Sequence, residues 1–177
     1  MTEIALSRRL FIALVSLLIA TLAFHGAVAS ALVTRGDDAL RSGDEKSAFM
    51  YYRRAMIFEP TVTTAADRLA FHLALHHSRV DAKRAIVIAN GGLHRNPQDG
   101  SLLADRALAE ERLKAWSTAE RDFTRAADIL HDARYDQFAG KAALQRGDRS
   151  AARQHFNHAL HLDPSFAPAR VALKASR

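Results

Sequence analysis

Histidine is the residue type in this sequence with the clearest potential for chemistry. The chain has nine histidines. His72 and His76 are four residues apart, and His155, His158 and His161 follow one another at steps of three. Imidazoles one helical turn apart can bind zinc or copper, but a closed site needs further ligands, and there is no cysteine to supply them. We therefore expect solvated helix faces here and no native metal site.

Catalytic motifs are missing from the sequence. It contains no GxSxG, no HExxH and no glycine-rich phosphate loop that follows a strand. The segment "NGGLHRNPQDG" has three glycines, but it follows an apolar periodic stretch of helical type. We expect no enzyme, no catalytic residue and no cofactor.

The composition predicts a helical protein. Hydrophobic residues make up 49% of the 177 residues, whereas glycine (8) and proline (4) are scarce, which favours helix over strand. The net charge is +6 and the pI is about 10.2. Because Arg and Lys alternate with Asp and Glu along most of the chain, we expect solvated helix faces rather than a basic patch.

A pattern of small, aromatic, small and proline residues recurs along the chain. Its offsets are zero, four, seven and twelve, and its last positions lie 37, 34 and 33 residues apart. A period near 34 is a repeat signature. The four sets are Ala48, Tyr52, Ala55 and Pro60; Ala85, Ala89, Gly92 and Pro97; Ala119, Phe123, Ala126 and His131; and Ala152, Phe156, Ala159 and Pro164.

Each position of the pattern has a physical role. Two small residues seven apart lie on one helix face and allow a neighbouring helix to approach, while the aromatic residue fills the core between them. Proline ends the unit. Upstream of the sets, residues 29–42, 63–76, 100–113 and 133–146 carry apolar residues at helical steps, and Gly43-Asp44 and Gly147-Asp148 are predicted turns.

This pattern resembles the tetratricopeptide-repeat (TPR) family over residues 29–177. The resemblance implies an all-α, right-handed superhelical stack of about four helix pairs, closed by a capping helix from about Ala167 to Lys174. The fourth unit matches best. The second is weakest: we expect its extra residues in the turn around His77 to Val80, and an early end of its second helix at Gly91 and Gly92.

In the TPR family the first helix of each pair lines a concave groove that binds an extended peptide or a helix. The family's carboxylate clamp is not reproduced, since Asp37 stands where the clamp has Asn and Val33 where it has Lys. The resemblance implies a protein partner; we expect no nucleic acid, because no aromatic-basic stacking pattern is present. It maps the following residues to the groove: Asp37, Arg41, Asp67, Phe71, Leu108, Glu111, Arg112, Arg134, Gln137 and Lys141.

The N-terminal segment directs the chain to a membrane. After a flank of residues 1–9, Leu10 to Val33 is 24 residues without a formal charge, and a helix of that length spans ~36 Å. A signal peptide cleaved after Ala27-Val28-Ala29 is the alternative. We favour a single transmembrane helix because the apolar stretch continues past Ala29. Arg8 and Arg9 favour an N-terminus on the inner side.

Together these features predict a membrane-anchored interaction scaffold. We expect a single-pass protein of the inner (cytoplasmic) membrane, with its repeat domain in the periplasm, that helps to assemble or stabilise an envelope complex. The alternative is a soluble exported periplasmic helper, released by cleavage near Ala29. A basic helical nucleic-acid-binding protein is a third reading, prompted only by the pI and opposed by the membrane-directed segment.

Overall fold

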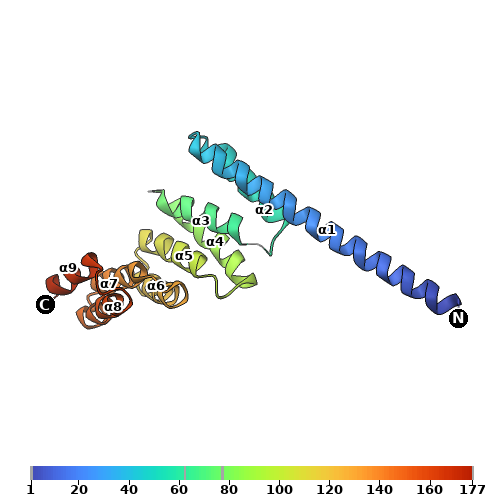
Figure 1. The fold of residues 1–177 in the computed structure, drawn as a ribbon. Helices are drawn as coiled ribbons and strands as arrows, with labels where there is room; N and C mark the ends of the chain where they lie inside the picture. Colours follow the sequence, from blue (N-terminus) through green and yellow to red (C-terminus); the bar gives the residue numbers. More distant parts are fainter. Residues whose placement is uncertain (1, 62, 77, 177) are drawn as a thin grey trace. The chain divides into compact units, whose positions relative to one another are not determined.

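The computed structural model describes residues 2–61, 63–76 and 78–176, with side chains from Leu10 onward. Within these ranges the regular structure is all helical, as predicted (Figure 1). The nine helices described are α1 (Thr2–Arg41), α2 (Glu45–Phe58), α3 (Thr64–Leu75), α4 (Arg79–Arg95), α5 (Gly100–Arg112), α6 (Trp116–Leu130), α7 (Ala133–Gln145), α8 (Arg149–Leu162) and α9 (Ala167–Ala175).

The chain divides into two compact units, Met1–Ala65 and Ala66–Arg177. In the first unit α1 is one continuous helix, so the apolar N-terminal segment and the first helix of the first pair follow each other without a break. The chain reverses after Arg41, and α2 packs back against α1. In the second unit, each helix from α4 to α9 packs against the next one along the chain (Figure 1).

The turns within the helix pairs have the predicted chemistry. Gly43 and Gly147 have φ of +82° and +85°, a left-handed conformation that costs glycine little. Asp44 and Asp148 follow them and accept hydrogen bonds from the amides of Ser47 and Ala151, at 3.0 and 2.9 Å, which caps α2 and α8. These two turns are therefore confirmed.

The third pair makes the same turn without glycine. Lys114 lies between α5 and α6 with φ of 63°. A side chain in this region is strained by roughly 1–2 kcal/mol, because its Cβ approaches the following carbonyl.

Close approach of paired helices defines the core. Gly36 on α1 faces the ring of Tyr52, and Gly140 on α7 faces the ring of Phe156. A Cβ on either glycine would lie 2.5 or 2.4 Å from a ring carbon. Both aromatic side chains are fully buried, as is Phe123, which packs with Ala107 in the third pair. The aromatic position of the pattern is thus confirmed as a core position.

The second pair corrects two expectations. Gly91 and Gly92 do not end α4, which continues to Arg95. Gly92 is held inside the helix by packing, because a Cβ there would lie 2.4 Å from Leu102 Cδ1. The extra residues also do not all lie in the turn. His77 is outside the described residues, and α4 already begins at Arg79 after the Ser78 cap, so the helix itself is longer, at 17 residues.

Helix α9 closes the second unit. Its Ala169 is fully buried and clusters with Ala133 of α7 and Ala159 of α8, while Val171 is exposed. One face of α9 covers the last helix pair and the other faces solvent, as a capping helix requires.

Candidate partner-binding groove

A groove crosses the first helices of the second, third and fourth pairs. It has a volume of about 450 Å³, and four residues each from α3 and α5 and three from α7 line it. This is the face that the family resemblance assigns to partner binding. We call it the aspartate groove, and its lining residues are Asp67, Arg68, Phe71, Leu75, Ser101, Ala104, Asp105, Leu108, Arg134, Tyr135 and Phe138.

A pair of carboxyl groups lies in the groove wall. Asp105 of α5 is only 4% exposed, and its Oδ2 is buried with no hydrogen-bond partner among the described residues. Burial is the largest cause that raises the pKa of Asp105, to about 9, and the adjacent Asp67 of α3, to which it is hydrogen-bonded, adds to the shift. Burial also raises the pKa of Asp67. The two groups therefore share a proton near neutral pH.

The aromatic side chains of the groove lie close to cations. Lys141 Nζ is 5.4 Å from the ring centroid of Phe138, and the guanidinium carbon of Arg134 is 6.0 Å from that of Tyr135. Arg134 also forms an ion pair with Asp132, the N-cap residue of α7. Its Nη2 lies 2.5 Å from Asp132 Oδ2, and this hydrogen bonding lowers the pKa of Asp132.

The structure brings only part of the predicted set into the groove. Four of the ten predicted residues line it: Asp67, Phe71, Leu108 and Arg134. Three others are near it, since Lys141 contacts Phe138, Arg112 donates to the carbonyl of Leu75 at 3.5 Å, and Glu111 has a pKa raised mainly by burial and opposed by Lys141 and Arg112.

The remaining predicted residues lie elsewhere. Gln137 is half-buried on α7 and is not among the groove's lining residues. Asp37 and Arg41 belong to the first unit. There, Asp37 accepts a hydrogen bond from the buried hydroxyl of Tyr52 at 2.7 Å, and Arg41 pairs with Asp38 at 2.5 Å. Asp37 therefore supports the packing of α1 on α2.

Sequence reasoning missed Asp105, Tyr135 and Phe138. A signal for Asp105 was available, because it is the one acidic residue in the apolar stretch "LLADRALA". A charged residue flanked on both sides by core positions of a helix is a candidate for burial. Tyr135 and Phe138 gave no such signal, since an aromatic side chain on a helix is as compatible with core packing as with a binding groove.

The histidines of α8 correct a second expectation. His155 is only 17% exposed, and its Nε2 lies 3.3 Å from Glu120 of α6. His158 Nδ1 lies 2.6 Å from Oδ2 of Asp136, a fully buried residue of α7. Contrary to expectation, these two histidines therefore do not lie on a purely solvated helix face but contact acidic residues of neighbouring helices. Hydrogen bonding to Asp136 is the first cause that raises the pKa of His155, aided by Glu120 and opposed by burial.

These histidines connect helices. Arg146 donates to the same Glu120 at 2.8 Å, so one network joins α6, α7 and α8. Among the described residues, no three His, Asp or Glu side chains are gathered in a way that could hold a metal ion. His161 stacks on His158 and remains exposed.

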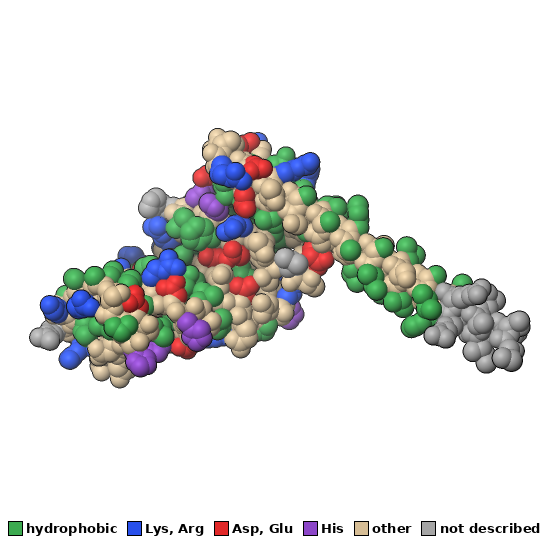
Figure 2. Space-filling view, viewed as in Figure 1, with side chains coloured by type: hydrophobic (Ala, Val, Ile, Leu, Met, Phe, Trp, Pro, Cys, Tyr) green, Lys and Arg blue, Asp and Glu red, His purple; other side chains and the backbone are tan. Residues whose placement is uncertain are grey.

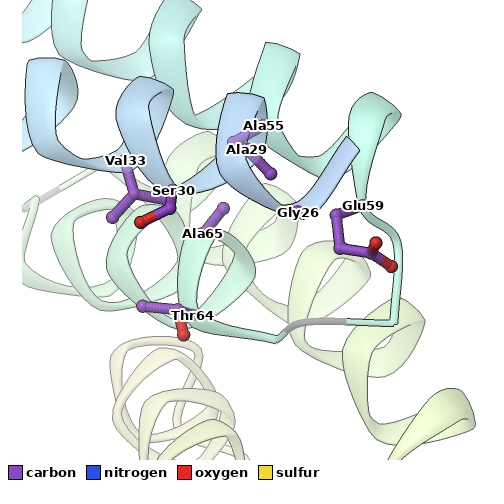
Figure 3. A pocket seen from close by; sticks show the side chains of 8 residues that line it. All are labelled: Gly26, Ala29, Ser30, Val33, Ala55, Glu59, Thr64 and Ala65. Carbon is purple, nitrogen blue, oxygen red and sulfur yellow. The ribbon is translucent and has the colours of Figure 1, made fainter. Parts of the chain in front are cut away.

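A smaller pocket lies within the first unit, where α1 meets α2 and the start of α3 (Figure 3). Its volume is about 220 Å³, and its wall includes Ala29, Ala55 and Ala65. Ala29 is only 6% exposed, so the end of the predicted signal sequence is part of the packing of this unit. Toward the N-terminus, the apolar side chains of α1 are exposed from Leu10 to Phe24 (Figure 2).

One helix among the described residues, Leu10–Arg41, is long and apolar enough to cross a membrane, and a signal sequence would meet the same criteria. Elsewhere, positive and negative side chains are interspersed on the face shown in Figure 2, in agreement with the charge pattern of the sequence.

These helix pairs, with their small and aromatic core positions and a groove along the first helices, have the fold of TPR proteins. The protein MamA is similar at a TM-score of 0.70 and 14% identity, over 85% of this chain and 81% of that one. A TPR protein from Parabacteroides merdae has a TM-score of 0.67 and 19% identity, over 83% and 58%.

Cut9, from the APC/C hetero-tetramer Cut9–Hcn1, has a TM-score of 0.65 and 18% identity, over 82% of this chain and 29% of its own. These likenesses establish the fold. Neither a protein-family model nor a curated protein matches the sequence.

Proposed function

We propose that this chain is a membrane-anchored scaffold whose aspartate groove binds a peptide or helix of a protein partner. The observation that carries the proposal is the groove itself: aromatic and charged side chains from three successive first helices line one hollow of about 450 Å³. This volume is in the range of ~300–1,000 Å³ typical of ligand sites. Cut9, which has a similar fold, was solved as a complex with Hcn1.

The proposed anchor is the apolar part of α1. Exposed leucine, isoleucine and phenylalanine side chains cover it, and such a surface is stable in lipid rather than in water. Ala29 supports an uncleaved anchor, because it packs in the pocket of the first unit. We place the repeat domain in the periplasm, where it would stabilise an envelope complex.

The absence of cysteine allows a clean test of binding. Ser101→Cys places one thiol in the groove, and Ser150→Cys places one on exposed α8 as a matched control. Each variant is labelled with a photo-crosslinking maleimide in native membranes. We expect a specific crosslinked partner from position 101 and none from position 150. Equal crosslinking at both positions would contradict groove binding.

The same control variant tests topology. In intact spheroplasts, a membrane-impermeant maleimide should label Ser150→Cys if the repeat domain is periplasmic. Protection of this thiol until the cells are lysed would place the domain in the cytoplasm.

The exported soluble form remains the second candidate, because the apolar segment of α1 also meets the criteria for a signal sequence. Intact-mass analysis separates the two. A chain that retains residues 2–29 supports the anchor, and a mass that begins at Ser30 supports the released helper.

A further inference from the structure

The aspartate groove contains a buried carboxyl group, Asp105, that has no basic partner in the part of the chain that the structure describes. Asp122 and Asp136, two other buried aspartates of this unit, each have a basic side chain at 2.6 Å, Arg106 and His158 respectively. One oxygen of each, Oδ1 in both cases, also lacks a hydrogen-bond partner within the described ranges, but a basic nitrogen of Arg121 or His155 lies 3.7 or 3.6 Å from it. Asp105 instead faces a second carboxyl group, Asp67, and its Oδ2 has no hydrogen-bond partner among the described residues. A buried polar atom without a partner is costly unless a ligand satisfies it.

The neighbouring cations do not fill this role. Arg134 lines the groove, but its guanidinium is held by Asp132 at 2.5 Å. Arg68 is exposed; its charge acts on Asp67, but it is the last and smallest of the influences on Asp105. A third acid, Asp99, also acts on both carboxyl groups, so acidic groups outnumber basic groups around the pair.

We propose that the Asp67–Asp105 pair receives one cationic side chain, a lysine or an arginine, from the protein segment that occupies the groove. This inference rests on the proposed function. The groove suits the whole side chain, since Phe71, Tyr135 and Phe138 offer aromatic surface to the aliphatic stem. The charged end would donate to Asp105 Oδ2 and to Asp67.

Binding of this kind is linked to protons. The free pair holds a shared proton, and an arriving cation favours ionisation of both carboxyl groups, so a proton is released. The charged and titratable groups near the pair are Arg68 on α3, Asp99 at the start of α5, and Arg134 and Tyr135 of α7, with Arg134 paired to Asp132. Affinity should rise as the pH increases toward the pKa of Asp105, about 9.

The test uses the full chain in lipid nanodiscs and a phage-displayed library of random dodecapeptides. Selection on the wild type is followed by counter-selection on a Phe71→Ala, Phe138→Ala variant, so that the retained peptides depend on the groove. We expect these peptides to share a lysine or arginine. Replacing that residue by norleucine should weaken binding about thirtyfold or more.

Asp105→Asn is the matched variant. Asparagine has the shape of the protonated acid and can still donate to Asp67, but it cannot ionise, so the unfolding midpoint should not fall. In this variant only Asp67 can ionise, so the preference for the lysine peptide over the norleucine peptide should become much smaller. Calorimetry in buffers of different ionisation enthalpy should detect proton release with the wild type and none with Asp105→Asn.

Each other outcome has one meaning. If no groove-dependent peptide is recovered, the proposed function fails, and the inference with it. If groove-dependent peptides lack a basic residue, or bind Asp105→Asn with the wild-type preference for lysine, the inference is wrong while groove binding stands. If spermidine binds as tightly as the peptides, the site belongs to a small amine and not to a protein segment.

Discussion

Two glycines inside helices of the same unit should differ in their response to alanine, with only one of them stabilised. A Cβ on Gly140 of α7 would lie 2.4 Å from Phe156 Cε1 and 2.8 Å from its Cδ1. Phe156 is fully buried, so its ring cannot move aside without disturbing the packing of α7 on α8. A Cβ on Gly91 of α4 meets only the flexible end of Arg95, at 3.9 Å.

The magnitudes follow from two effects. Alanine stabilises a helix interior by about 1 kcal/mol relative to glycine, and both variants gain this. Only Gly140→Ala adds overpacking, which typically costs about 1–3 kcal/mol. The shared gain cancels in the comparison, so the free energies of unfolding of the two variants should differ by about 1–3 kcal/mol, with Gly91→Ala the more stable.

Urea unfolding of the full chain in detergent, followed by circular dichroism at 222 nm, measures the difference. At an m-value of ~1–3 kcal/mol/M, the midpoints should be separated by roughly 1 M. Helix stacks can unfold in more than one step, so the midpoints are compared within one series of variants. Equal stabilisation by both substitutions would show that Phe156 does not pack on Gly140, and would refute the register of the fourth pair.

Two further changes test single side chains. Lys114→Gly should raise the free energy of unfolding by about 1 kcal/mol, because it removes left-handed strain at the turn between α5 and α6, and an unchanged or lower urea midpoint would count against this turn. The raised pKa of His155 means that the folded state holds a proton more tightly than the unfolded state. Its stabilisation is therefore complete below the ordinary value of 6.5 and is lost as the pH rises through the folded-state pKa. Asp105, whose pKa is also raised, changes stability in the same direction, so the comparison is between wild type and His155→Gln. Thermal midpoints should fall less steeply with pH in the variant, and parallel profiles would exclude the contribution of His155.

The positions of the core could be predicted from spacing because the repeat pattern is set by packing. Tyr52, Phe123 and Phe156 occupy one offset in three pairs, and all three are fully buried. The second pair differs because Leu73, on the first helix, and Ala89, on the second, are both buried at the corresponding positions. In this pair the first helix contributes the large side chain and the second helix the small one. A pattern that requires an aromatic residue on the second helix therefore does not predict this core position.

The partners and protonation of buried titratable groups could not be predicted, because a residue's type does not show which side chains of the neighbouring helices it contacts. His155 is a helix-surface residue by its spacing, yet it contacts Glu120 on α6, 35 positions earlier in the chain. Gly91 and Gly92 are equally unfavourable for an isolated helix, but the contact of Gly92 with Leu102 explains why α4 continues through them. Contacts between neighbouring pairs decide such cases, and they depend on the stack as a whole.

The buried aspartates show how contacts between neighbouring helices separate a structural role from a binding role. Asp122 joins α6 to Arg106 of α5, which also donates to Asn90 of α4 at 2.6 Å, so its charge is used within the stack. Asp136 serves α7 and α8 in the same way through His158. Asp105 has the same residue type and comparable burial, but its carboxyl group faces the groove and another acid. A structural role predicts that Asp105→Asn is neutral or stabilising and has no effect on binding. Asp122→Asn should weaken the fold because it leaves Arg106 without its counter-charge, and Asp136→Asn because an amide replaces one of the two oxygens that lie against His155 and His158. A reduced lysine preference in Asp105→Asn, with the fold intact, is the result that only a binding role explains.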